Sequence, residues 1–267
     1  MHPVLIQIGS LLIPSYGAFA ALGVLAALAL AQFTSPRVGI DSRHVWNALA
    51  LAVFSALVAE RGLLIALNLA NLRQHPDWLL ALALVHHPLL SGVGASVAVL
   101  AVVGYVRWAH LPFRSFADAL AAPVAIGLAF EQIGCLLVGS DFGRETVSGT
   151  WGAITYTSPL AARWSGTPLG IPLVPAQAYA ALGAALVALL CGLWLHRCHR
   201  QPGEVAGLGF LSFGVVLFLS ECLRDWEGRG VLHFARFGAV IDAPQLAAFA
   251  LVLGGATLLA DWRSDHA

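Results

Sequence analysis

The 267-residue sequence contains no lysine and few charged residues of either sign. All fourteen basic residues are arginine, and fourteen acidic residues balance them. Charged residues make up 10% of the chain, against about 25% in soluble domains. No basic run is present that could form a nucleic-acid patch or a polybasic lipid-binding cluster. The composition therefore predicts no nucleic-acid partner and argues against a soluble protein.

Several catalytic and metal-binding patterns are also missing. The four cysteines show no two-residue spacing typical of metal or redox pairs; they are Cys135, Cys191, Cys198 and Cys222. No histidine and glutamate pattern of a zinc protease occurs, and no metal is predicted. Neither a phosphate-binding glycine loop with lysine nor a Gly-x-Ser-x-Gly turn is found. ATP hydrolysis and serine-hydrolase chemistry therefore have no basis in the sequence.

Long apolar stretches dominate the chain, which is 59% hydrophobic with a mean hydropathy of +0.81. A membrane-spanning helix needs about 20 apolar residues, because its backbone groups must bond within the segment. Seven stretches qualify: Tyr16–Phe33, Trp46–Asn71, Gly92–Trp108, Phe116–Gly139, Pro175–Leu195, Gly207–Leu223 and Pro244–Ala260. None alternates with period two, as barrel strands do. The sequence predicts an all-α polytopic membrane protein, with residues 1–267 forming one integral membrane domain of about seven helices.

Two connections are too long to be plain turns. The segment 139–174, between the fourth and fifth stretches, is rich in Gly, Thr, Trp and Pro. Its aromatic residues Trp151, Tyr156 and Trp164 are of the type found at lipid headgroup level. We therefore expect a small extracytoplasmic cap there. The other connection holds an apolar piece at 78–85 that is too short to span, and we expect an interfacial helix.

The arginines in short loops predict the orientation of the chain. Seven fall on one side of the predicted membrane: Arg37, Arg43, Arg107, Arg114, Arg197, Arg200 and Arg263. That side is predicted to be cytoplasmic, so the N-terminus lies outside and the C-terminus inside. The first stretch has no basic start and no small-residue cleavage site, and we expect it to be retained.

Ionisable residues occur where a plain membrane anchor would have none. A charge at bilayer depth costs at least about 2.5–3.5 kcal/mol, so each is paired, hydrated or functional. The candidates are Glu60, Arg61, Asp118, Glu131 and Glu221. Adjacent residues point about 100° apart on a helix, so Glu60 and Arg61 are expected to meet different helices. Glu221 and Arg224, three apart, are expected to share a face near a helix end. Structural ion pairs that lock helices together are the alternative.

The order of these residues resembles the prolipoprotein diacylglyceryl transferase family over nearly the whole chain. Phe130–Arg144 is similar to the family's Gly-Arg-x-Gly-Asn/Cys-Phe-x-x-Gly-x-x-x-Gly segment. Other marks follow in family order: Ser15-Tyr16-Gly17, Ala59-Glu60-Arg61, Asp118 with Pro123, Pro175-Ala176-Gln177-Ala178-Tyr179, Glu221 with Arg224, and Gln245. The family's seven spans match the count above.

The resemblance implies transfer of diacylglycerol from phosphatidylglycerol, or a related phospholipid, to the thiol of a prolipoprotein lipobox cysteine. It also implies a bacterial inner-membrane location and no cofactor. A base must take the thiol proton, and cations must stabilise the departing phosphate. The candidate catalytic residues are Glu221, Arg224 and Arg61. Candidate phospholipid-binding residues are Tyr16, Gly134, Gly139, Gly143, Arg144, Gln177 and Tyr179.

Four positions depart from the family pattern. Gln132 and Leu217 stand where the family has Arg, Val174 stands for a His, and Ala180 for a Glu. Losing two cations favours a second hypothesis, a non-catalytic paralogue that binds a lipid or a partner in the same cavity. A transporter that uses Glu60, Glu131 and Glu221 as a relay is a third, although no internal repeat of broken helices supports it.

Overall fold

A computed structural model describes residues 2–8, 11–69, 88–198, 201–225 and 243–264. The chain divides into two compact units, each described here by itself. The first combines Met1–Val45 with Phe113–Ala267, and the second is Trp46–Pro112.

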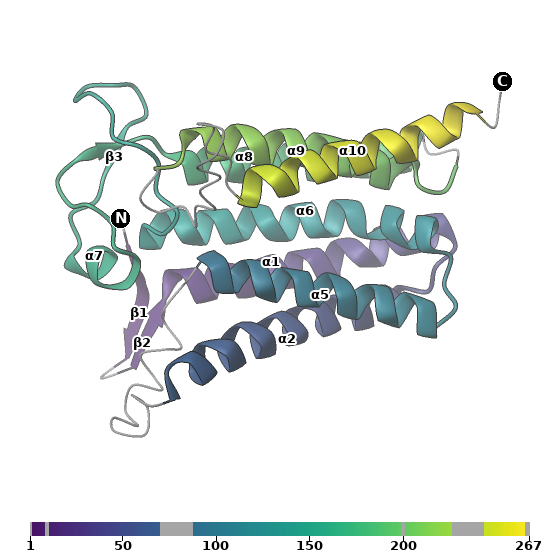
Figure 1. The fold of residues 1–267 in the computed structure, drawn as a ribbon, viewed down its shortest axis with the longest axis horizontal. Helices are drawn as coiled ribbons and strands as arrows, with labels where there is room; N and C mark the ends of the chain where they lie inside the picture. Colours follow the sequence, from purple (N-terminus) through teal and green to yellow (C-terminus); the bar gives the residue numbers. More distant parts are fainter. Residues whose placement is uncertain (1, 9–10, 70–87, 199–200, 226–242, 265–267) are drawn as a thin grey trace, which may run out of the picture. The chain divides into compact units, whose positions relative to one another are not determined.

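The first unit is a helical bundle organised around one long helix, α6. Its elements are α1 (Ser15–Thr34), a short 3-10 helix η1 (Ser35–Val38), α6 (Phe113–Val138), α8 (Ala176–Arg197), α9 (Glu204–Leu223) and α10 (Ala243–Ser264). α6 packs against α1 on one side and against α8 and α9 on the other, and α10 packs on α9 (Figure 1). The core between α6, α8 and α9 contains Ala122, Val187, Cys191 and Val205.

The second unit contains the larger part of α2 (Ser42–Leu67) together with α5 (Pro88–Trp108). Asn47 Nδ2 donates a hydrogen bond of 3.2 Å to Tyr105 Oη. A Cβ at Gly94 would lie 3.1 Å from the carbonyl oxygen of Ala56, so the two helices approach closely there.

Each of the seven predicted apolar stretches matches a helix over most of its length, which confirms the all-α polytopic membrane fold. In the described part of the chain, five helices are long and apolar enough to cross a membrane: Ser15–Val38, Ser42–Leu67, Phe113–Val138, Ala176–Arg197 and Glu204–Leu223. Gly92–Trp108 and Pro244–Ala260 are shorter apolar helices, so the count of seven spans stays a prediction. The interfacial helix expected at 78–85 lies outside the described residues.

Small residues let the helices of the first unit approach to backbone contact. A Cβ on Gly23 of α1 would lie 2.8 Å from the carbonyl oxygen of Gly127 on α6. A Cβ on Gly255 of α10 would lie 2.6 Å from the carbonyl oxygen of Gly207 on α9. Lipid tails are as apolar as leucine, so close packing of this kind replaces the hydrophobic effect in holding membrane helices together.

Asp118 is the fully buried carboxylate of α6, and its role is structural. It accepts hydrogen bonds of 2.7 Å from the backbone amides of both Gly203 and Ala206, at the start of α9. The first amides of a helix have no partner inside the helix, and a carboxylate there also complements the positive end of its dipole. This buried charge thus caps α9 from a neighbouring helix.

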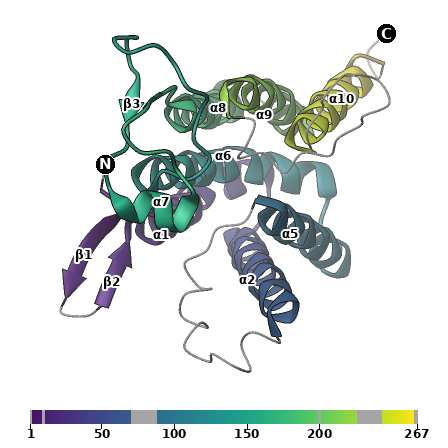
Figure 2. The same cartoon turned by 60° about the vertical axis from the view of Figure 1, so that its left-hand side comes forward.

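Short strands, which the sequence analysis did not predict, precede α1. β1 (Val4–Ile8) and β2 (Leu11–Pro14) form an antiparallel pair, and the Ser15 amide donates to Pro3 O at 3.0 Å. Residues between α6 and α8 form a small folded cap with β3 (Ile154–Thr155), α7 (Pro159–Ser165) and β4 (Pro172–Leu173). The hairpin and the cap lie at the same end of this unit (Figures 1 and 2).

Candidate functional site at the cap end of the bundle

A backbone junction joins the cap to the ends of two helices. Residues 142–145 pair with residues after α9 on one side and with residues before α8 on the other. The Arg144 amide donates to Leu223 O at 3.0 Å, and the Asp225 amide to Phe142 O at 3.1 Å. The Val174 amide donates to Arg144 O at 3.0 Å. The junction therefore fixes the last residues of the family-like segment Phe130–Arg144 beside the end of α9.

Gly143 is at the centre of this junction, and only glycine fits there. A Cβ at this position would overlap the carbonyl oxygen of Val174 and would lie 3.0 Å from the carbonyl oxygen of Leu223. Its φ is not in the left-handed region, so the requirement is one of space. The residue predicted to bind phospholipid thus acts by letting three backbone segments meet.

Arg224 and Glu221 form the buried ion pair of the site. Arg224 Nη1 lies 2.7 Å from Glu221 Oε1, which confirms that the two share a face at the end of α9. Glu221 is 1% exposed, whereas 17% of the Arg224 side chain is accessible. Burial alone lowers the pKa of Arg224, but the carboxylates of Asp141 and Glu221 outweigh burial and raise the pKa above its ordinary value. Arg224 is therefore a fixed cation.

Gln132 links this ion pair to α6. Its Oε1 accepts a hydrogen bond of 3.3 Å from Arg224 Nη2, and its Nε2 donates to Glu131 Oε2 at 2.9 Å. The thiol of Cys135, itself buried, donates a longer contact of 3.6 Å to Glu131 Oε1. A polar chain thus runs from Glu221 through Arg224, Gln132 and Glu131 to Cys135. The sequence analysis treated Gln132 only as a lost arginine and missed this bridge.

Buried polar side chains fix the backbone where α6 ends and the cap begins. Gln177, fully buried, donates from Nε2 to Ser140 O at 2.7 Å. Tyr156 Oη donates to Leu136 O at 2.9 Å, and Thr167 Oγ1 donates to Gly139 O at 2.9 Å. Gly139 has a φ of 94°, in the region that favours glycine.

One expectation about the cap aromatics is wrong. Tyr156 was expected at the headgroup level, but it is 0% exposed and forms the cap's own core with Ala161 and Leu173. Burial raises the pKa of its phenol, so it remains a neutral hydrogen-bond donor. The sequence could not distinguish it from Trp151, which is 92% exposed.

The remaining predicted residues take varied positions. Gly134 packs α6 on α1, where a Cβ would lie 3.2 Å from Tyr16 Cα. Tyr16 is half-buried, Tyr179 is 42% exposed, and the Arg144 side chain is exposed in the cap.

Arg61 belongs to the second unit, so it is described apart from the Arg224 site. Its Nη2 lies 3.9 Å from Glu60 Oε1, and the expectation that these neighbours would not pair is wrong. The side chains bend toward each other despite their different directions on the helix. Among the described residues, no three His, Cys, Asp or Glu side chains converge to hold a metal ion.

These features define a class of protein: a polytopic helical membrane protein whose buried polar site lies where a small folded cap meets the bundle. The family model for prolipoprotein diacylglyceryl transferase matches residues 3–260. The chain therefore belongs to the prolipoprotein diacylglyceryl transferase family.

Three relatives show how far the similarity extends. A protein of Clostridium tetani named phosphatidylglycerol–prolipoprotein diacylglyceryl transferase is 29% identical over 233 residues, which cover 86% of this chain and 88% of the relative. A protein of the same name from Azospirillum brasilense is 29% identical over 98% of this chain and 95% of its own length. The second such transferase of Clostridium perfringens is 25% identical over 97% and 94%.

Proposed function

We propose that this protein is a phosphatidylglycerol–prolipoprotein diacylglyceryl transferase. A lipobox cysteine thiolate would attack the carbon of the diacylglycerol part that bears the phosphate. A carbon–sulfur bond would form, the carbon–oxygen bond to phosphate would break, and glycerol phosphate would leave with the electron pair. The names of the relatives support the reaction and both substrates. The family's bacterial membrane setting supports a plasma-membrane location, with the N-terminus and the cap outside and the C-terminus in the cytoplasm.

The observation that carries the proposal is the buried pair of Glu221 and Arg224. A guanidinium presents several N–H donors in a rigid fork, so it can stabilise a departing phosphate while one edge stays paired. Glu221 occupies one Nη of Arg224 and Gln132 the other, which fixes the plane of the fork beside the cap junction. Glu221 therefore acts on the reaction by positioning Arg224.

The other predicted residues divide into two roles in this proposal. Tyr16, Arg144 and Tyr179 keep accessible side chains and are proposed to contact the phospholipid. A further group shapes the backbone around the lipid without exposed polar atoms of its own: Gly134, Gly139, Gly143 and Gln177. Arg61, in the second unit, is proposed as a catalytic residue only because Ala59-Glu60-Arg61 resembles a family segment.

The test is a transfer assay on the whole purified protein in nanodiscs that contain phosphatidylglycerol. A lipobox peptide is added, and mass spectrometry detects the mass increment of one diacylglyceryl group. Glu221→Gln should abolish transfer while the protein still inserts and folds, because the neutral amide leaves Arg224 unclamped. Glu145→Gln, the same change on an exposed cap side chain, should leave the rate unchanged. Unchanged turnover in Glu221→Gln would remove Glu221 from the site.

A second candidate function, lipid binding without turnover, is favoured by one specific observation. This chain has Gln132 and Leu217 where the family has arginine, so two cations that could contact a phosphate are missing. The Gln132 side chain instead hydrogen-bonds Glu131 and Arg224. A wild-type protein that is folded and holds phosphatidylglycerol, yet gives no mass shift, would replace the transferase proposal with this one.

A further inference from the structure

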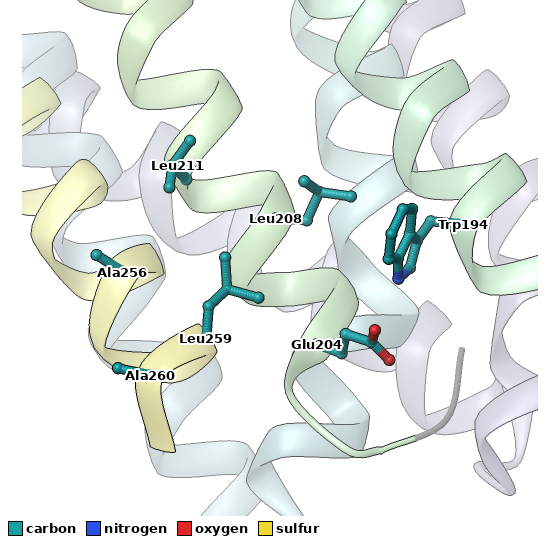
Figure 3. Close-up of a pocket in the computed structure, with 7 residues that line it drawn as sticks. All are labelled: Trp194, Glu204, Leu208, Leu211, Ala256, Leu259 and Ala260. Carbon is teal, nitrogen blue, oxygen red and sulfur yellow. The ribbon is translucent and has the colours of Figure 1, made fainter. Parts of the chain in front are cut away.

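A cavity of about 410 Å³ lies between α8, α9 and α10 (Figure 3). Its lining includes Glu204, the first residue of α9, whereas Arg224 follows the last. Glu204 and Arg224 are separated by the whole of α9, a rise of about 30 Å at 1.5 Å per residue. The cavity is therefore separate from the site described above. Its lining includes Trp194 from α8, Glu204, Leu208 and Leu211 from α9, and Ala256 and Leu259 from α10.

The polar groups of the cavity gather at one end. Glu204 is 6% exposed, an unusual degree of burial for a carboxylate. The Nε1 atom of Trp194 is buried and makes no hydrogen bond within the described part of the chain. Figure 3 shows the indole nitrogen and the carboxylate on the same side of the cavity. A buried donor without an acceptor costs about 1–3 kcal/mol, so an acceptor supplied by a ligand would be favoured there.

The rest of the lining is apolar, and its α9 leucines lie further along the helix from its start. Leu208 and Leu211 follow Glu204 along α9 at about 6 Å and about 10 Å of helical rise. Glu204 and Trp194 flank the connection between two membrane-spanning helices, where the bilayer meets water. The lining therefore changes from polar at the interface to leucine within the bilayer, which is the head-to-tail polarity of a lipid.

The polar end matches a particular head group. A carboxylate accepts N–H donors at up to about four lone-pair sites, so Glu204 can bind a ligand ammonium besides its contacts within the protein. The indole supplies an N–H donor for a phosphate or ester oxygen, and its ring face attracts cations. We propose that this cavity binds a phospholipid whose head group carries a primary ammonium, with one acyl chain along Leu208 and Leu211. A head group without an ammonium could not make this contact with Glu204.

The test uses native mass spectrometry of the whole protein with phosphatidylethanolamine and phosphatidylglycerol that have identical acyl chains. Glu204→Gln should weaken retention of the ethanolamine lipid about tenfold, which is the loss of affinity expected when one charge-assisted hydrogen bond is removed. Ala256→Phe, which fills the cavity from α10, should abolish retention of this lipid at the site. Leu253→Phe places the same ring at a 66% exposed position of α10 outside the cavity, and should have no effect.

Two outcomes would overturn the proposal. One is that Ala256→Phe lowers retention of the two lipids by the same amount, because the cavity would then not prefer the ammonium head group. The other is that Ala256→Phe and Leu253→Phe change retention of the ethanolamine lipid to the same extent, which would indicate general contact with bilayer lipid. A change at buried Glu204 can prevent folding. If Glu204→Gln does not fold, the comparison of Ala256→Phe with Leu253→Phe tests the proposal. Binding of phosphatidylglycerol at the Arg224 end should be the same in all variants. This test is therefore independent of the transferase proposal.

Discussion

Replacing Gly143 by alanine should open the cap junction without disturbing the helices. The added Cβ would overlap Val174 O and press on Leu223 O at 3.0 Å, so residues 142–145 must move away from one or both neighbours. The move would break the hydrogen bonds from Arg144 N to Leu223 O and from Val174 N to Arg144 O. At about 1 kcal/mol for each bond, with a further cost for carbonyls left buried, we expect a loss of about 2–3 kcal/mol.

Hydrogen exchange of the backbone amides of Arg144 and Val174 measures this loss directly. A destabilisation of about 2–3 kcal/mol corresponds to exchange that is faster by about 30- to 150-fold. Gly192→Ala is the matched control, since no neighbour lies within 4 Å of a Cβ at that position of α8. Alanine there should keep or slightly increase stability. Exchange in Gly143→Ala within about twofold of wild type would refute the steric argument, because a real overlap cannot leave both bonds intact.

Two further changes test the buried polar contacts. Asp118→Asn should lower the free energy of unfolding in detergent by about 1–2 kcal/mol, because one amide oxygen replaces two carboxylate acceptors for the first amides of α9. Glu145→Gln, the corresponding change at an exposed site, is the control, and equal effects would contradict the capping role. Tyr156→Phe removes the donor to Leu136 O and should cost about 1 kcal/mol in the same measurement, more than Tyr179→Phe at a 42% exposed position. No difference between the two tyrosine variants would contradict the assigned hydrogen bond.

The membrane fold was predictable from the sequence because spanning helices follow from local composition. Each apolar stretch satisfies its own backbone within one helix, so no distant partner is needed for its recognition. The hairpin of β1 and β2 was missed because strands of five and four residues carry too little pattern. The pairing of Glu60 with Arg61 was misjudged because helical direction constrains Cβ, whereas long side chains can bend toward each other.

The candidate site was predictable only where its contacts are local. The pair of Glu221 and Arg224 follows from a spacing of three residues, and the structure confirms it. The hydrogen bond from Arg224 to Gln132 joins residues 92 apart, and no spacing rule connects them. Gly143 matched a family motif, but the sequence does not show why glycine is required there. The requirement comes from Val174 and Leu223, which approach Gly143 from distant parts of the chain.

The backbone contact between Gly207 on α9 and Gly255 on α10 has a consequence for biogenesis. α9 is long and apolar enough to cross the bilayer alone, so its insertion into the membrane does not depend on the fit between the two helices. Their association does depend on it, because a Cβ on Gly255 would lie 2.6 Å from Gly207 O. A larger side chain there would give a chain that is threaded through the membrane yet left unassembled. Such a defect would be detected by membrane quality control, before any chemistry could be measured.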